Sequence, residues 1–372
     1  MEYELSIVMP CLNEAETVAV CVKKAMEFLN KNEIVGEVII GDNGSTDGSR
    51  TLAANAGAKV VNVEKKGYGN ATRQAISYAK GKYIITADTD DSHDLLNLMP
   101  FIIKLREGYD LVMGNRFKGE RIPAAMSVLH RYVGNPLLTG VGNVFFRTKV
   151  GDFHCGLRGF TKEAFNAMDL KTTGMEFASE IVVKASLNNL KIAEVATTVY
   201  PAGRSRRPHL RSFPDGWRHL RFLLLYSPKW LFLLPGLVVI ILGLFFSLLI
   251  VFNDEMDVNW LPLSAFAVII GFQFCLFYAL TKIYAINHGI APRPKNYGKI
   301  FKILNLELGL IVGLITSLIG FIGIAYTLFY SLASSFQLEL VTCSSLFLVL
   351  GIQIILFSFF FSILGLGEKM QA

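Results

Sequence analysis

Cysteine and charge are both scarce in this sequence. The five cysteines show neither a Cys-x-x-Cys pair nor the spacing of a metal site, and they stand at positions Cys11, Cys21, Cys155, Cys275 and Cys343. We expect reduced thiols used for packing in a protein that faces the cytosol, and no zinc site or disulfide framework. Charged residues make up only 18% of the chain and hydrophobic residues 52%, a balance that points to a membrane protein.

A basic leader is also lacking. The start, Met1 to Glu4, carries no positive residue and runs into a strand pattern, so we expect no signal peptide and a first half that stays where it is made. The net charge of +6 is modest. Because the basic residues cluster next to the apolar half, anionic lipid is the favoured partner and nucleic acid is not expected.

The apolar residues are concentrated in the second half. We predict an α/β domain over residues 1–203, a basic amphipathic segment at the membrane interface over 204–229, and a transmembrane domain over 230–372. Four apolar segments in that domain exceed the roughly 20 residues that cross a bilayer, namely 230–252, 260–281, 308–330 and 341–364. The protein is therefore expected to be integral to the cytoplasmic (inner) membrane.

The loops between these segments differ in charge. Those at 253–259 and 331–340 contain no Lys or Arg, whereas the loop between the second and third segments contains five, Lys282, Arg293, Lys295, Lys299 and Lys302. By the positive-inside rule, the soluble domain, this basic loop and the C-terminus are predicted to be cytoplasmic.

The first half alternates between strand and helix patterns. Predicted strands lie at 5–9, 37–40, 59–63, 83–87, 110–113 and 192–200, and a loop is predicted from 152 to 160. Such alternation predicts an α/β fold with a mostly parallel sheet, whose ligands bind at the carboxyl ends of the strands. Asn13 and Glu16 have the spacing of a capping box for the first helix.

Acidic residues follow two of these strands. Asp42 ends one, and Asp88 and Asp90 follow the apolar run from Tyr83 to Ala87. Neighbouring carboxylates repel unless a cation lies between them, and Mg²⁺ and Mn²⁺ take oxygen ligands and bridge to phosphates. The pattern predicts a metal–diphosphate site; a solvated acidic turn is the alternative.

Two further segments have a membrane character. Residues 124–146 are apolar but interrupted by glycine and proline, which indicates an element that grazes the membrane, with ordinary core packing as the alternative. Between Arg204 and Arg221 there are six arginines, and Phe213 and Trp217 share a helical face. We expect this helix to lie among lipid headgroups rather than in water.

Four motifs together resemble the catalytic domain of glycosyltransferase family 2, which has the GT-A fold. They are Ser6-Ile7-Val8-Met9-Pro10-Cys11-Leu12-Asn13-Glu14, Asp42-Asn43-Gly44-Ser45-Thr46-Asp47-Gly48, Lys66-Gly67-Tyr68-Gly69 and Asp88-Thr89-Asp90. Further along, Gly114-Asn115-Arg116, Arg131, Asp152 and Gly156-Leu157-Arg158 are similar to the dolichyl- and undecaprenyl-phosphate sugar synthases of that family. The resemblance covers residues 5–207, and the four apolar segments resemble those of bacterial polyprenyl-phosphate glucosyltransferases.

The resemblance implies roles for individual residues. The nucleotide sugar would be bound by Pro10, Asn13, Glu14, Asp42, Lys66 and Gly67. Mg²⁺ or Mn²⁺ would be held by Asp90 and Asp88. A Gln that follows in the relatives is replaced here by Ser92, so Asp91, Ser92 or His93 completes the metal shell, and Asp91 is the ligand we predict. The catalytic set would be Asp88, Asp90, Arg116, Arg131 and Asp152, in which the two arginines hold the acceptor phosphate, with Arg204, Arg206 and Arg207 as the next candidates.

The activity that this implies is an inverting transfer of a hexose from a nucleotide sugar to a membrane polyprenyl phosphate. UDP-glucose is the first expectation, followed by GDP-mannose or an N-acetylhexosamine donor. Undecaprenyl and dolichyl carriers both remain open, as does assembly into a homo-oligomer.

Two other function classes have to be weighed. A processive polysaccharide synthase shares the fold but carries a Gln-x-x-Arg-Trp motif, which this sequence lacks. A flippase or transporter subunit with a degenerate, non-catalytic domain would leave the acidic edge unused, and the apolar segments contain scarcely any ionisable residue for coupled transport.

Overall fold

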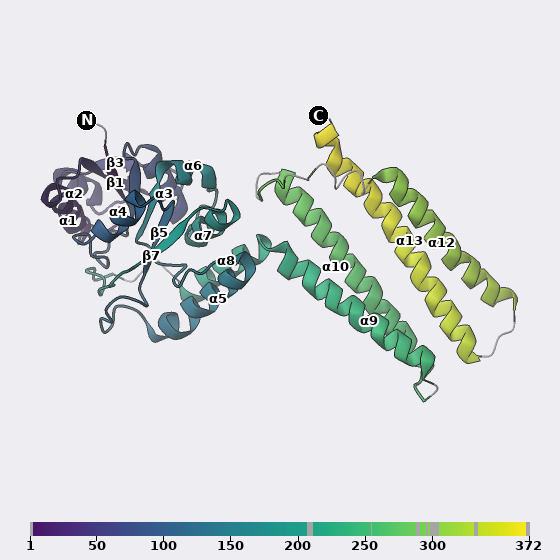
Figure 1. Ribbon diagram of the computed structural model, residues 1–372. Helices are drawn as coiled ribbons and strands as arrows, with labels where there is room; N and C mark the ends of the chain where they lie inside the picture. The colour runs from purple at the N-terminus through teal and green to yellow at the C-terminus, as the bar shows by residue number, and fades with distance from the viewer. Residues whose placement is uncertain are drawn as a thin grey trace. The chain divides into compact units, whose positions relative to one another are not determined.

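The computed structural model describes residues 3–206, 211–253, 255–287, 291–294, 297, 305–330 and 334–369 (Figure 1). The chain divides into two compact units, Met1–Leu223 and Leu224–Ala372. Arg207, one of the arginines that the sequence singles out, lies outside the described residues, as do Lys295, Lys299 and Lys302 of the basic loop.

The first unit is built on a seven-stranded sheet. Its spatial order is β3-β2-β1-β4-β6-β5-β7. The strands are β1 (Leu5–Cys11), β2 (Gly36–Asp42), β3 (Lys59–Asn62), β4 (Tyr83–Thr86), β5 (Leu111–Asn115), β6 (Arg158–Thr161) and β7 (Ile192–Ala196). All pairings are parallel except those of β6, which runs antiparallel to both β4 and β5. The predicted α/β fold with a mostly parallel sheet is confirmed.

Helices follow most of the strands. They are α1 (Val18–Lys31), α2 (Ser49–Asn55), α3 (Tyr68–Ser77), α4 (Met99–Arg106), α5 (Asn135–Phe146), α6 (Lys162–Met168), α7 (Phe177–Leu187) and α8 (Ser212–Leu225), with a π-helical turn, η1 (His130–Gly134), before α5. Apolar residues of α1 such as Val22 and Phe28 are buried with Ile7 and Met9 of β1 in the main core. Because successive strand residues face opposite sides, α3 can pack closely against Gly41 on the other face.

Strand β6 differs from the sequence interpretation. Residues 152–160 were expected to form one loop, but the part from Arg158 onward is a central strand. Its four residues are too few to show a period, and its pairing with β4 joins residues about 75 positions apart. The prediction was therefore wrong for Arg158–Phe160.

The first helix also begins differently. Thr17 is the N-cap of α1, so Asn13 and Glu16 do not form the predicted capping box. Asn13 instead has a φ of 56° and accepts a hydrogen bond from the backbone N–H of Thr46. Glu16 accepts from the backbone N–H of Ser205 at 2.7 Å. Both side chains are used in long-range contacts that overrule the local capping pattern.

The second unit contains α9 (Leu234–Phe252), α10 (Leu261–Asn287), α12 (Leu306–Phe329) and α13 (Ser334–Lys369), with short turns η2 (Lys229–Leu233) and η3 (Val258–Trp260). Among the described residues, four helical stretches are long and apolar enough to cross a membrane, Lys229–Phe252, Val258–Asn287, Leu306–Phe329 and Phe336–Gly365. They contain the four predicted segments except for Tyr330. Gly236 and Gly271 let α9 and α10 approach closely, since a Cβ on either would lie within 3 Å of the other's carbonyl oxygen.

Candidate active site

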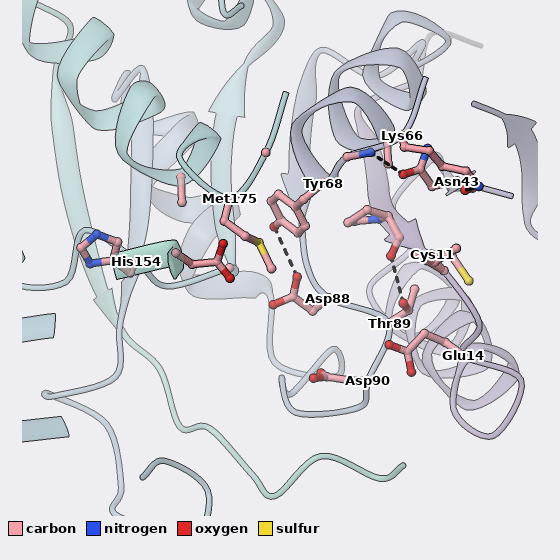
Figure 2. A pocket seen from close by; sticks show the side chains of 18 of the residues that line it. Cys11, Glu14, Asn43, Lys66, Tyr68, Asp88, Thr89, Asp90, His154 and Met175 are labelled. Atoms are coloured by element: carbon pink, nitrogen blue, oxygen red, sulfur yellow. Dashed lines mark hydrogen bonds between the residues drawn. The ribbon is translucent and has the colours of Figure 1, made fainter. Parts of the chain in front are cut away.

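The first unit contains a pocket of about 440 Å³ beside the carboxyl ends of β1 and β4, within the roughly 300–1,000 Å³ typical of small-ligand sites. Figure 2 shows its lining from close by. The lining includes Pro10 near the end of β1 and Glu14 after it, Lys66 and Gly67 before α3, and Asp88 and Asp90 after β4. These six residues, all predicted from the sequence, are brought together here.

Asp42 and Asn13, also predicted to bind the nucleotide, do not line this pocket. Asp42 is fully buried at the end of β2, where its carboxylate accepts from the backbone N–H groups of Gly44 and Ser45 and from Arg50 Nε at 2.6 Å. Its neighbour Asn43 lines the pocket instead. The contact of Asp42 with a base or ribose stays a prediction.

Asn43 fixes the loop that precedes α3. Its Nδ2 donates to the carbonyl oxygens of Val63 and Lys65, and its Oδ1 accepts from the backbone N–H of Gly67 at 2.7 Å. Lys66 Nζ donates to the Asn43 carbonyl oxygen at 2.6 Å (Figure 2). The loop is thus held so that a lysine and a glycine N-terminal to α3 border the cavity.

Asp88 has a distinct hydrogen-bonding environment. Tyr68 Oη lies 3.3 Å from its Oδ1, and His93 Nε2 lies 3.5 Å from its Oδ2. Burial raises the pKa of Asp88, but the contacts with His93 and Tyr68 and the nearby charge of Arg116 outweigh it, so that the net pKa is lowered. The carboxylate is therefore charged at neutral pH. Its side chain is 37% exposed, so a ligand in the pocket can contact it.

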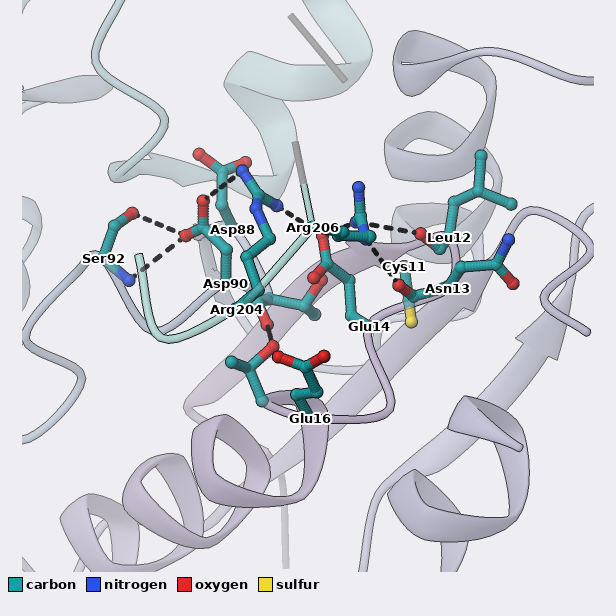
Figure 3. A network of polar contacts seen from close by, with 12 residues as sticks. Cys11, Leu12, Asn13, Glu14, Glu16, Asp88, Asp90, Ser92, Arg204 and Arg206 are labelled. Carbon is teal, nitrogen blue, oxygen red and sulfur yellow. Dashed lines mark hydrogen bonds and ion pairs between the residues drawn. The ribbon is translucent and has the colours of Figure 1, made fainter. Parts of the chain in front are cut away.

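Asp90 is linked to Glu14 through Arg204, and a second arginine also contacts Glu14. Arg204 Nη1 lies 2.6 Å from Glu14 Oε1, and its Nη2 lies 3.0 Å from Asp90 Oδ2, while Arg206 also contacts Glu14 Oε1 (Figure 3). Ser92 Oγ donates to Asp90 Oδ1 at 2.6 Å. Burial raises the pKa of Glu14 despite the two arginines, which lower it. Arg204 thus brings a positive charge between two acidic side chains of the pocket.

The residues considered as further metal ligands point in different directions. Asp91 has both carboxylate oxygens within 2.9 Å of Lys24 Nζ, Ser92 contacts Asp90, and His93 lies beside Asp88. Within the described part of the chain, no group of three or more His, Cys, Asp or Glu residues could hold a metal ion. Asp88 and Asp90 nonetheless supply carboxylate oxygens, which suit Mg²⁺ or Mn²⁺ when phosphate oxygens complete the shell.

The two arginines predicted to hold the acceptor phosphate have different surroundings. Arg116 forms a two-point contact with Asp152, with Nε–Oδ2 at 2.6 Å and Nη2–Oδ1 at 2.8 Å. Neither residue lines the pocket, although the charge of Arg116 acts on Asp88. Arg131 lies in η1 and does not line the pocket either. Their contact with an acceptor stays a prediction.

Sequence reasoning missed a group of pocket residues, which lie on the loop before β6, on the loop before α7, on α7 itself and on α8. They are His154, Gly174, Met175, Ala178, Asp215, Arg218 and His219. Buried Ser179 Oγ lies 2.8 Å from His219 Nδ1 and 3.4 Å from His154 Nε2. Burial lowers the pKa of both histidines, to about 4 for His219, so both rings are neutral at pH 7.

Arg158 holds this side of the pocket together. Its guanidinium is fully buried and donates to the carbonyl oxygens of Phe153, Cys155 and Ala178, at 2.9, 2.7 and 2.6 Å. The three carbonyls belong to the loop before β6 and to α7. Arg158 therefore fixes the backbone on which His154 stands, and its appearance in the Gly-Leu-Arg motif was the one available signal for this region.

Comparisons with known proteins agree with this architecture. Residues 6–168 match the model described as Glycosyl transferase family 2, and residues 279–365 match Glycosyltransferase family 2 C-terminal transmembrane region. The second match and the four apolar helices indicate an integral membrane protein.

Several curated proteins of Haloferax volcanii are similar to the chain. The low-salt glycan biosynthesis hexosyltransferase Agl6 is 42% identical over 64% of this chain and 57% of its own length. Glycosyltransferase AglJ is 34% identical over 56% of this chain and 67% of its length. A dolichyl-phosphate hexose transferase is 27% identical over 52% of this chain and 81% of its length. The chain thus spans little more than half the length of Agl6.

Among solved structures, glucosyl-3-phosphoglycerate synthase from Mycobacterium tuberculosis, in complex with Mn²⁺, UDP and glucosyl-3-phosphoglycerate, is 21% identical with a TM-score of 0.46. That match covers 60% of this chain and 78% of the synthase chain. The family model over the sheet domain, AglJ at 34% identity, and the parallel sheet with its acidic edge all lead to one assignment. The chain belongs to glycosyltransferase family 2.

Proposed function

We propose that this glycosyltransferase moves a hexose from a nucleotide sugar to the phosphate of a membrane polyprenol, with inversion at the anomeric carbon. The observation that carries the proposal is a pocket with Asp88 and Asp90 at the end of β4, in a chain that continues into four apolar helices. The similarity to a protein named as a dolichyl-phosphate hexose transferase supports a lipid phosphate as acceptor.

The proposed chemistry needs no strong base. The second pKa of a phosphate monoester is about 6, so the acceptor oxygen is largely anionic at pH 7. This oxygen forms the new bond to the anomeric carbon while the bond from that carbon to the donor's diphosphate breaks, and the electron pair leaves with the nucleoside diphosphate. Protein groups therefore have to hold two anions in line and stabilise the one that leaves.

Asp90 and Asp88 are the residues that would hold Mg²⁺ or Mn²⁺ next to the donor's diphosphate, with Asp91 as the predicted further ligand. A bound divalent ion would supply charge stabilisation for the departing diphosphate. The Nη2 of Arg204, which lies 3.0 Å from Asp90, would then turn to phosphate oxygens while its Nη1 keeps Glu14. Lys66, at the entrance to α3, is the second cation on this side.

The donor is proposed to be UDP-glucose, with GDP-mannose and UDP-N-acetylglucosamine as the next candidates, and the carrier undecaprenyl or dolichyl phosphate. Membranes containing the protein should be incubated with each labelled donor, a polyprenyl phosphate and Mg²⁺ or Mn²⁺, and the glycolipid extracted. Label in the lipid fraction from one donor is the expected result. Absence of labelled lipid with all three donors would contradict the proposal.

Asp90→Asn tests the metal role. The amide is isosteric and keeps an acceptor for Ser92, so the fold should persist, whereas loss of the charge should lower transfer by at least about 100-fold. Binding of Mn²⁺ with UDP, measured by calorimetry, should weaken in parallel. Asp94→Asn on the same loop is the control, since Asp94 does not line the pocket. Unchanged Mn²⁺ binding in Asp90→Asn would remove Asp90 from the metal site.

We further propose that the catalytic unit faces the cytoplasm. The loop at 253–259 has no Lys or Arg, whereas the loop between α10 and α12 is basic. In a chain with Cys275 and Cys343 replaced by serine, because these two are not buried, Asn259→Cys should react with a membrane-impermeant maleimide from outside intact cells. Arg293→Cys in the same chain should react only after permeabilisation. The reverse pattern would contradict this orientation.

A further inference from the structure

Helix α8 contributes three residues to the pocket, Asp215, Arg218 and His219. It can do so because one face of the helix, formed by Asp215, His219, Phe222 and Leu223, is buried in the first unit. Arg218 lies one turn from both Asp215 and Phe222, at the edge of that face. The helix expected only to lie among lipid headgroups is therefore also a wall of the pocket.

The other basic side chains around the pocket are already engaged. Arg204 contacts the carboxylates of Glu14 and Asp90, and Lys66 donates to a backbone carbonyl at 2.6 Å. Arg116, behind the lining, is held by Asp152 at two points. Each of these cations would have to give up short contacts to bind a new anion.

Arg218 is held far more loosely. Among the residues that the structure describes, its one contact with a carboxylate is Nη1 to Asp215 Oδ1 at 3.3 Å, and its side chain is 54% exposed. Asp215 also accepts from the backbone N–H of Arg211 at 2.7 Å, so it keeps a partner if Arg218 turns away. Because the Arg218 side of this 3.3 Å pair is in contact with water and Asp215 has a second partner, the pair holds the guanidinium weakly and leaves it available for a ligand.

The opposite face of α8 presents aromatic side chains. Phe213 is 81% exposed and Trp217 58% exposed, and Trp217 precedes Arg218 directly in the chain. Exposed aromatics on an amphipathic helix are typical of contact with the apolar part of a lipid. A single helix thus offers an apolar surface and, at the edge of the pocket, a cation with a planar fork suited to phosphate.

We propose that Arg218 binds the phosphate of the polyprenyl acceptor and delivers it to the pocket, an inference that rests on the proposed function. A lipid phosphate fits better than free inorganic phosphate, because the exposed aromatic side chains of α8 can pack against a hydrocarbon chain, which inorganic phosphate lacks. Among the described residues, Arg218 thereby replaces Arg116 and Arg131 as the preferred candidate for the acceptor contact.

The test compares Arg218→Ala and Arg218→Lys with Arg221→Ala, using the full chain in detergent. Arg221 lies on the same helix, is exposed and does not line the pocket. Transfer is measured while polyprenyl phosphate and nucleotide sugar are varied separately. Binding of farnesyl phosphate, inorganic phosphate and UDP is measured by calorimetry, which requires no turnover.

Arg218→Ala should raise the KM for polyprenyl phosphate at least about tenfold and weaken farnesyl phosphate binding equally, since a charge-assisted two-point contact is lost. The KM for the donor and the affinity for UDP should change less than twofold. Arg218→Lys should recover part of the loss because it keeps the charge without the fork, and Arg221→Ala should behave as the wild type.

Other outcomes would overturn the inference. A rise in the donor KM or weaker UDP binding would assign Arg218 to the nucleotide. Equal wild-type affinities for inorganic and farnesyl phosphate would mean that the hydrocarbon chain of the lipid is not recognised. Unchanged farnesyl phosphate binding together with an unchanged KM for polyprenyl phosphate would mean that Arg218 does not contact the acceptor. If the wild type labels no lipid from any donor but binds UDP, the proposed function fails, and the acceptor role of Arg218 with it.

Discussion

Asp152→Ala should destabilise the catalytic unit strongly, because it removes the partner of a buried arginine. Asp152 has no exposed surface and accepts two side-chain hydrogen bonds from Arg116, at 2.6 and 2.8 Å, as well as one from the backbone N–H of His154 at 3.1 Å. The Arg116 side chain is only 14% exposed. Burial lowers the pKa of Arg116, but the hydrogen bonds and the charge of Asp152 outweigh this effect and raise the pKa, so the guanidinium remains charged.

Breaking such a pair by removing one partner costs about 3–5 kcal/mol, because the remaining charge stays buried without compensation. For a unit of roughly this size, each kcal/mol corresponds to about 2–4 °C, so the melting temperature should fall by roughly 6–20 °C. The magnitude is large beside the ~5–15 kcal/mol that holds a typical domain folded.

A thiol-reactive dye provides the assay in a chain with Cys275 and Cys343 replaced by serine, since the remaining Cys11, Cys21 and Cys155 are buried in this unit and react only when it opens. The double variant Arg116→Gln with Asp152→Asn removes both charges and keeps an acceptor for the His154 N–H. It should regain at least half of the lost melting temperature. A melting temperature within about 2 °C of the wild type in Asp152→Ala would refute the reasoning. Full transfer by the stable double variant would count against an acceptor contact by Arg116.

Three further predictions concern the pocket. A methyl group at Gly156 would collide with the Asp88 carboxylate, so Gly156→Ala should lower kcat at least about tenfold, while the dye assay shows a folded unit; normal kcat would mean that Asp88 can move freely. Asp91→Asn loses only the partly exposed pair with Lys24, so stability should change by less than about 1 kcal/mol. Mn²⁺ binding by calorimetry should weaken because Asp91 is the predicted further ligand, and unchanged binding would contradict that role. Burial lowers the pKa of His219 to about 4 from 6.5, so neutral His219 stabilises the fold fully above pH 6.5, and this stability is lost as the pH falls toward 4. From pH 7 to pH 5, the free energy of unfolding should therefore fall by about 2 kcal/mol less in His219→Gln than in the wild type. Thermal unfolding followed by circular dichroism measures the difference, and equal losses would contradict the low pKa.

Local patterns were sufficient for much of this protein. The strand and helix alternation, the acidic ends at Asp42 and Asp88, and the four apolar helices each depend on residues close together in the chain. Since hydrophobic period and length act locally, they predicted the parallel sheet and the membrane helices. The motifs around Pro10, Lys66 and Asp88 also predicted residues that meet in one pocket.

Only the tertiary structure decided which partners these residues have. The Arg204–Asp90 and Arg116–Asp152 pairs, and the approach of α8 to His154, join positions tens to more than a hundred apart. Strand β6 forms because it pairs with β4 and β5. Asn13 does not cap α1 as expected but accepts a hydrogen bond from the backbone N–H of Thr46. Such contacts depend on how packed elements bring distant side chains within hydrogen-bonding distance, which the spacing of residues along one segment does not encode.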